Sequence, residues 1–301
     1  MRIVSLLPSC TEIVCALGCA GQLVGRSHEC DFPPEVQSAP VCTSAKVDST
    51  ASSAEIDRQI KSLLQRALSI YQVDVARIEQ LRPDIILTQD QCEVCAVSPA
   101  DLPKALKGEP KIVSTSAKRL ADIWLDIQRI ADALGVAADG RTLLDGLKNH
   151  VVDIIQKTCM IKKRPTVACI EWFDPLMAAG NWIPEMIDLA GGKDLLGAPG
   201  KHSAWLEWEK LAEANPDLMI LMPCGFDLER TRRESVSLAN QPLWSGLRAV
   251  KTKNVFITDG NHFFNRPGPR IVESIEILAE MLQPKLFSFG HENTSWARMI
   301  R

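Results

Sequence analysis

Cysteine side chains with metal-binding spacing follow two apolar runs of this chain. Cys92 and Cys95 form a C-x-x-C pair shortly after the run 85–88, and Cys224 follows the run 218–221. Thiolates at this spacing bind zinc and related ions, and they also carry out thiol–disulfide exchange. One C-x-x-C pair is too small for a closed structural zinc site, so Cys224 is a candidate third thiolate. Simple packing of these thiols in the interior stays an alternative.

Histidines follow two further apolar runs. His28 comes after the run 23–27, and His262 comes after the run 255–257. Imidazole is the most common borderline ligand for zinc, cobalt and iron. Consecutive residues rarely all bind one ion, so at most one or two of His28, Glu29 and Cys30 are expected to do so. The predicted metal ligands are His28, Cys92, Cys95, Cys224 and His262.

Polar and aromatic side chains occupy the same positions after apolar runs, where they suit an organic ligand. Tryptophan in particular offers a flat apolar face together with a hydrogen-bond donor. Any single aromatic residue is more often part of the core, but several here cluster at the ends of predicted strands. The predicted ligand-binding residues are His28, Glu29, Gln89, Asp90, Glu171, Trp172, Phe173, Trp182, Phe226, Asn261, His262 and Phe263.

The elements that must position these residues alternate between strand and helix. The runs 85–88 and 218–221 share one lead-in, a helical segment that ends in a Pro-Asp turn at Pro83 and at Pro216. This repeat predicts an α/β fold with two Rossmann-like lobes, each built on a parallel sheet. Ligands in such sheets bind outside the carboxyl ends of the strands. We therefore expect the site in a cleft between the lobes.

A long stretch of helical spacing, 120–161, separates the two halves, with Gly135 and Gly140 marking a bend or brief interruption. A helix of this length would join the lobes as a stiff connection that permits only a small hinge motion. We predict an N-terminal lobe over 1–116, a connecting backbone helix over 117–164, a C-terminal lobe over 165–286 and a tail over 287–301 without clear periodicity.

Bulk composition narrows the functional class. The 301 residues carry a formal net charge of −3, which disfavours nucleic acid as a partner. No apolar run approaches the roughly 20 residues of a membrane helix. Ten cysteines suit a reducing cytoplasm, and the polar segment Ser9 to Glu12 reads as a helix capping box rather than part of a signal peptide. We expect a cytoplasmic protein without a membrane span.

Enzymatic activity is left open and is not favoured by the motifs. The chain contains no G-x-S-x-G, no Walker A and no H-E-x-x-H sequence. A thiol-dependent enzyme using a cysteine with a histidine partner stays an alternative, since the same groups also bind metals.

The order of the short motifs resembles one known family. The segments that carry the likeness are Ile3-Val-Ser-Leu-Leu-Pro-Ser-Cys-Thr-Glu12, Leu23-Val-Gly25, Asp31-Phe-Pro-Pro34, Ile78-Glu-Gln-Leu-Arg-Pro-Asp84, Gly191-Gly192, Asn215-Pro-Asp217 and Arg266-Pro-Gly-Pro-Arg270. Together they resemble the substrate-binding proteins of ABC importers for vitamin B12, haem and iron-siderophores, with the cobalamin-binding branch as the nearest likeness. The resemblance extends over about residues 1–285.

This resemblance implies two α/β lobes bridged by a long helix, with a small-molecule ligand in the cleft between them. The implied ligand is a corrinoid such as cobalamin or another metal chelate, with His28 or His262 at the axial face of the metal. Direct binding of a Zn, Fe or Co ion by the Cys/His cluster is the alternative. Family members usually carry a secretion signal or lipid anchor, and we expect none here, which argues against an ABC permease as partner.

Overall fold

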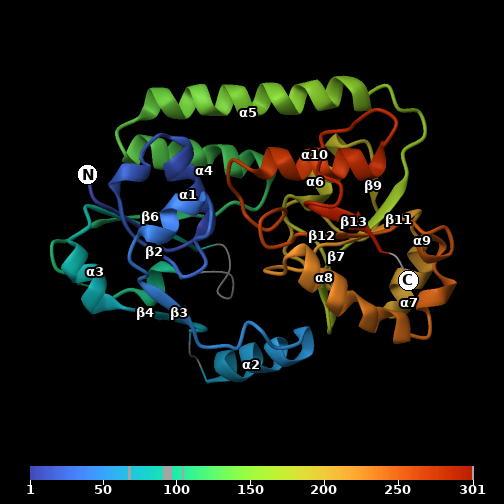
Figure 1. The fold of residues 1–301 in the computed structure, drawn as a ribbon, viewed down its shortest axis with the longest axis horizontal. Coiled ribbons are helices and arrows are strands. Elements are labelled where there is room, and N and C mark those ends of the chain that lie inside the picture. Colours follow the sequence, from blue (N-terminus) through green and yellow to red (C-terminus); the bar gives the residue numbers. More distant parts are fainter. Residues whose placement is uncertain (67–68, 91–96, 104, 300–301) are drawn as a thin grey trace. The chain divides into compact units, whose positions relative to one another are not determined.

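The computed structural model describes residues 1–66, 69–90, 97–103 and 105–299. Contacts between residues divide the chain into two compact units, shown in Figure 1. Unit 1 consists of Met1–Ala51, Glu55–Ala117 and Ala121–Gly146, and unit 2 consists of Ser52–Ala54, Lys118–Leu120 and Leu147–Arg301. The predicted α/β class is confirmed, and each unit contains its own sheet.

The sheet of unit 1 is parallel and has the strand order β2-β1-β5-β6. Its strands form because short apolar runs are buried on both faces, as parallel sheets covered by helices require. Central Ile3 lies opposite Leu23 on one side and Ile85 on the other. The strands are β1 (Ile3–Ser5), β2 (Leu23–Arg26), β5 (Ile85–Gln89) and β6 (Lys111–Thr115).

Helices of unit 1 begin at recognisable signals. In α3 (Val75–Leu81), the Asp74 side chain accepts a hydrogen bond from the Arg77 N–H at 3.0 Å and caps the helix. The predicted capping box at Ser9 is wrong, because α1 (Pro8–Ala16) begins with a proline, which suits a first helical turn without a free N–H. Helix α4 (Leu120–Ala133) also lies mainly in this unit.

A two-stranded antiparallel ribbon completes unit 1. It consists of β3 (Thr43–Ala45) and β4 (Tyr71–Val73), with Thr43 opposite Val73. The amphipathic helix α2 (Ser53–Gln65) lies between these strands in sequence, and its Ile60 and Leu63 pack against the apolar core of the unit. This ribbon was not among the elements predicted from the sequence.

The sheet of unit 2 has the order β10-β8-β7-β11-β12-β13, with β9 pairing β7. Strands β7, β11 and β12 are parallel neighbours, as predicted, whereas the pairs β7–β8, β8–β10 and β12–β13 are antiparallel. The short turn between β7 and β8 explains one reversal, since parallel strands need a longer crossover. The strands are β7 (Thr166–Phe173), β8 (Leu176–Ala178), β9 (Lys193–Asp194), β10 (Ala204–Trp205), β11 (Leu218–Leu221), β12 (Val255–Thr258) and β13 (Trp296–Arg298).

Helices of unit 2 follow the strands, and short 3-10 helices occur in both units. The helices are α6 (Ile183–Leu189), α7 (Trp208–Ala214), α8 (Leu228–Ser235), α9 (Arg248–Lys251) and α10 (Ile271–Leu282). The 3-10 helices are η1 (Ala20–Gln22), η2 (Pro34–Ser38), η3 (Pro99–Asp101), η4 (Val236–Asn240) and η5 (Trp244–Gly246).

The predicted backbone helix consists of two helices, α4 and α5 (Ala137–Thr158), in place of one. Gly135, at the predicted interruption, adopts a φ of +76°, which glycine accepts at little cost. Helix α5, the long green helix of Figure 1, contributes residues to both units, with the division after Gly146. Within the described ranges, no helix has both the length and the apolar character needed to cross a membrane.

Candidate functional site

At the sheet of unit 1, the predicted ligand-binding residues lie after two strands that both neighbour β1. His28 and Glu29 follow β2, Gln89 ends β5, and Asp90 comes next. Gln89 is buried, whereas Asp90 is exposed and donates its backbone N–H to the Thr115 carbonyl oxygen at 3.0 Å. The parallel order therefore brings these four residues to one edge of the sheet.

His28 is half-buried and is held by hydroxyl groups. Its Nδ1 lies 2.8 Å from Thr43 Oγ1 on β3, and its backbone N–H donates to the same oxygen at 3.1 Å. Burial lowers the pKa of His28, and the nearby positive charge of Arg26 lowers it further. The imidazole is therefore neutral at pH 7, which is the form that binds metals.

Glu29 is held beside His28 by the ribbon. The Tyr71 hydroxyl on β4 donates to Glu29 Oε1 at 3.3 Å, and the Tyr71 ring lies 6.0 Å from the His28 ring between centroids. Cys30, in contrast, is buried, and its Sγ accepts a hydrogen bond from Thr11 Oγ1 at 3.0 Å. Glu29 and His28 thus face one pair of strands, while Cys30 belongs to the interior.

At the sheet of unit 2, Glu171 and two aromatic residues end β7. Ser203 Oγ donates to Glu171 Oε2 at 2.7 Å, which fixes that carboxylate. Trp172 is half-buried, and its ring lies 5.3 Å from that of Phe226 after β11. Phe226 is buried and also meets Phe173 edge to face, with centroids 6.4 Å apart. These three rings form one cluster at the ends of neighbouring strands.

Arg230 on α8 extends this cluster. Its guanidinium carbon lies 3.7 Å from the centroid of the Phe226 ring, a cation–π contact. Phe173, Trp182 and Phe226 are all buried, so Trp172 is the member of the predicted aromatic set at this edge that keeps a substantial exposed face. Trp182 donates its Nε1–H to the Phe264 carbonyl oxygen at 2.7 Å, which anchors it in the interior.

The loop after β12 is organised by Asp259. Its Oδ1 accepts backbone N–H groups from Asn261 at 3.0 Å and His262 at 2.8 Å, and its Oδ2 lies 2.8 Å from His262 Nδ1. A carboxylate on one ring nitrogen fixes the orientation of the imidazole. Buried Phe263 follows, with the Arg270 guanidinium carbon 5.2 Å from its ring centroid.

The thiols of the predicted metal site are only partly placed. Cys224 is exposed, and its backbone N–H donates to the Glu171 carbonyl oxygen at 3.2 Å. Cys92 and Cys95 lie outside the described residues. Among the residues that the structure does describe, no group of three or more His, Cys, Asp or Glu side chains is arranged to hold a metal ion.

Several partners of the site were not predicted from the sequence. Thr43 and Tyr71 come from the short ribbon, and Ser203, Asp259 and Arg230 complete the loops of unit 2. Asp259 follows its strand directly and stands three residues before His262, which is the one sequence signal that indicated such a pair. Thr43 gave no comparable signal.

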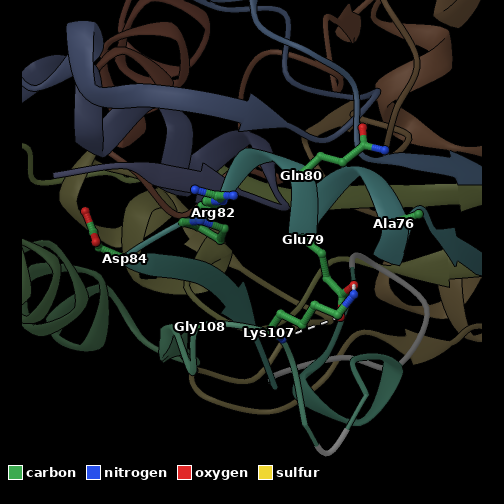
Figure 2. Close-up of a pocket in the computed structure, with 8 residues that line it drawn as sticks. Ala76, Glu79, Gln80, Arg82, Asp84, Lys107 and Gly108 are labelled. Atoms are coloured by element: carbon green, nitrogen blue, oxygen red, sulfur yellow. Dashed lines mark hydrogen bonds and ion pairs between the residues drawn. The ribbon is translucent and has the colours of Figure 1, made fainter.

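One cavity in unit 1 lies away from these residues, and a second is lined in part by Thr43. A cavity of about 740 Å³ is shown in Figure 2, at the edge of the sheet where β5 and β6 begin. Lys107 contacts Glu79 there twice, through its Nζ at 3.4 Å from Oε2 and through its backbone N–H, which donates to Oε1 at 3.4 Å. A second, of about 430 Å³, adjoins the ribbon. The first is lined by Ala76, Glu79, Gln80, Arg82, Pro83, Asp84, Lys107 and Gly108, none of them a predicted ligand residue.

The fold and the polar, aromatic strand-end loops are those of a two-lobe α/β solute-binding protein. The chain belongs to the periplasmic binding protein family, whose model matches residues 3–261. The family resemblance seen in the short motifs is confirmed.

The sequence identity to individual relatives is low. The chain is 25% identical to an uncharacterized ABC transporter substrate-binding lipoprotein, YvrC, of Bacillus subtilis, over 95% of this chain and 81% of that protein. It is 22% identical to a vitamin B12-binding protein of Vibrio cholerae, over 94% of this chain and 89% of the relative.

Solved structures show the same fold. A periplasmic heme-binding protein from Pseudomonas aeruginosa matches with a TM-score of 0.70 and 20% identity, over 95% of this chain and 93% of that chain. The periplasmic vitamin B12-binding protein BtuF of Vibrio cholerae matches with a TM-score of 0.65 and 18% identity, over 94% and 96% respectively.

Proposed function

We propose that this protein binds a corrinoid or a chemically similar metal chelate through residues that directly follow its strands. The observation that carries the proposal is the neutral, half-buried imidazole of His28 at the end of β2. Such a group offers one nitrogen donor to a metal while its other nitrogen is held by Thr43.

A chelated metal fits this arrangement better than a bare ion. A corrin ring supplies the equatorial ligands of its cobalt, so the protein needs to add only one axial donor. A bare zinc ion needs three or four protein ligands. In the described part of the chain, His28 belongs to no group of three metal-binding side chains, and Cys92 and Cys95, which the bare-ion alternative needs, lie outside that part.

The edge of unit 2 supports a flat ligand. The half-buried Trp172 packs on Phe226, which Arg230 covers from another side, so the tryptophan ring has a fixed orientation. A fixed indole offers a broad apolar face for a ring system. The relatives named for vitamin B12 and heme agree with this class of ligand.

The first experiment is native mass spectrometry of the purified protein before and after addition of hydroxocobalamin. We expect a stoichiometric adduct, and His28→Ala should lower the affinity at least tenfold, because it removes the axial donor. His150→Ala is the matched control, since its imidazole lies on α5 and pairs with Glu276 at 2.6 Å.

Two results would count against the proposal. Unchanged affinity in both His28→Ala and His262→Ala would remove axial ligation by histidine. A metal-sized mass already on the protein, without any corrinoid adduct, would indicate direct binding of an ion, and loss of that mass in Cys92→Ser/Cys95→Ser would assign it to the thiols.

A further inference from the structure

Thr43 makes contact with His28 through one oxygen in two ways. Thr43 Oγ1 accepts the His28 backbone N–H at 3.1 Å and lies 2.8 Å from His28 Nδ1. The same hydroxyl donates to Ser27 Oγ at 3.0 Å. Both Thr43 and Ser27 are buried, so water does not compete for these bonds.

Counting protons on the Thr43 hydroxyl links its hydrogen bond to Ser27 with the tautomer of His28. A hydroxyl has one proton and two lone pairs. The proton goes to Ser27, and one lone pair accepts the His28 backbone N–H. With the Thr43 proton on the Ser27 side, the second lone pair accepts from Nδ1, so Nδ1 carries the ring proton; a reversed bond from Ser27 to Thr43 would instead place that proton on Nε2. With the proton on Nδ1, the neutral ring keeps its lone pair on Nε2.

The second ring nitrogen is available for a ligand. Within the described ranges, no hydrogen bond to His28 Nε2 is found, whereas Nδ1 lies 2.8 Å from Thr43 Oγ1 and 3.5 Å from Ser27 Oγ. Tyr71 limits rotation of the imidazole, because its ring lies 6.0 Å away at an angle of 53° and its hydroxyl is tied to Glu29. The ribbon β3–β4 thus holds the ring from two strands.

We propose that Thr43 is a positioning residue that holds His28 as the Nδ1–H tautomer, so that Nε2 coordinates the metal of the bound chelate. This inference rests on the proposed function. Nε2 would donate its lone pair to the metal of the chelate in exchange for a water ligand. No proton is released and no electron is transferred, because the ring proton stays on Nδ1.

The test compares Thr43→Val with Thr43→Ser. Valine keeps the branched shape and removes the hydroxyl, whereas serine keeps the hydroxyl. With hydroxocobalamin as the probe, we expect Thr43→Ser to retain the visible spectrum of the imidazole-ligated cobalt. Thr43→Val should bind roughly 10- to 100-fold more weakly, as other losses of such supporting hydrogen bonds do, and its spectrum should shift toward the water-ligated form. Circular dichroism and thermal unfolding check that both variants fold.

A second measurement needs no ligand. Nitrogen-15 NMR of the labelled ligand-free protein reports which ring nitrogen of His28 is protonated. We expect the Nδ1–H form in wild type and Thr43→Ser, and a mixture in Thr43→Val. An unchanged tautomer in Thr43→Val would overturn the inference. If wild type shows the Nδ1–H form but binds no corrinoid, the proposed function fails while the effect of Thr43 on the ring stands.

Discussion

At the residue scale, His28 combines a metal-binding nitrogen with an environment that keeps the ring neutral. Burial and the charge of Arg26 both lower its pKa. The neutral form is then favoured in the folded state more than in the unfolded chain. Stability from this form is complete above the ordinary pKa of about 6.5 and declines as the pH falls from there toward the lowered pKa.

The affinity for the ligand should depend on pH in the same direction as the stability does. Protonation of Nε2 competes with coordination, so we expect the affinity for hydroxocobalamin to stay constant from about pH 8 to about pH 6.5 and to fall only below that value. Titrations of the dissociation constant against pH test this, with His28→Ala as the control that should bind weakly at every pH. A loss of affinity that begins above the ordinary histidine pKa would contradict the assignment.

At the element scale, the C-terminal strand shows how a segment without periodicity becomes ordered. Strand β13 pairs with β12, and the buried carboxylate of Glu280 on α10 accepts N–H groups from the segment before it. These are the backbone N–H of Phe289, that of Gly290 at 2.7 Å and that of His291 at 3.2 Å, and the indole Nε1–H of Trp296 at 2.8 Å. A buried charge that receives so many donors is well satisfied, so the segment is held by polar bonds.

A second carboxylate on α10 adds a pH-dependent contact. Glu276 Oε2 lies 2.8 Å from His291 Nε2, and this hydrogen bond raises the pKa of His291, with further contributions from the charges of Glu276, Glu280 and Glu273. Burial alone would raise the pKa of Glu276, but the hydrogen bond from His291 and the charge of His150 outweigh it, so the pKa is lowered.

The direction of the pKa shift of His291 gives a prediction for the pH dependence of stability. A histidine with a raised pKa contributes its full stability below about pH 6.5 and loses it as the pH rises through the raised value. We therefore expect His291→Gln to lower the melting temperature more at pH 6 than at pH 9, measured by calorimetry. His202→Gln in another loop of the unit serves as control, and an equal loss at both pH values would show that only packing was affected.

Helix α5 contains two glycines in different surroundings. At Gly146, which is exposed, an added Cβ would meet no atom within 4 Å, whereas at Gly140 it would fall 2.4 Å from the Ala131 Cβ of α4. Glycine inside a helix costs about 1 kcal/mol relative to alanine. We expect Gly146→Ala to stabilise the protein by up to about that amount, and Gly140→Ala to destabilise it by crowding α4.

Chemical denaturation of the two variants measures both effects, and each acts as the control for the other. Stabilisation by both alanines would mean that α4 can shift to accept the added methyl group at Gly140. Destabilisation by both would mean that Gly146 has a role beyond helix propensity.

At the scale of the whole molecule, the sequence predicted the parallel core of each unit well. The runs 85–88 and 218–221 became β5 and β11, because a strand buried on both faces is a continuous apolar run with a clear turn before it. Short edge strands such as β9 and β10 have two residues each and carry no readable period. Such a short segment forms a strand because it pairs with a neighbouring strand, and the local spacing of residues does not record that pairing.

The candidate site likewise contains residues that the sequence predicted and partners that it did not. Residues directly after central strands, such as His28 and Glu171, could be chosen from position alone. Their partners could not, since Thr43 lies 15 residues from His28 and Tyr71 lies 42 residues from Glu29. Aromatic residues were the hardest to judge, because burial of Phe226 depends on packing that no spacing records. The cytoplasmic location and the absence of a permease partner stay predictions.

The contact between Tyr71 and Glu29 has a practical consequence, because Tyr71 is the single tyrosine of the chain. Replacing tyrosine with a fluorinated analogue during expression would place one fluorine atom in the entire protein, next to His28. The fluorine NMR spectrum would then contain a single protein resonance, free of overlap. Its position and width would report the occupancy and exchange rate at that loop during a titration, without any mutation.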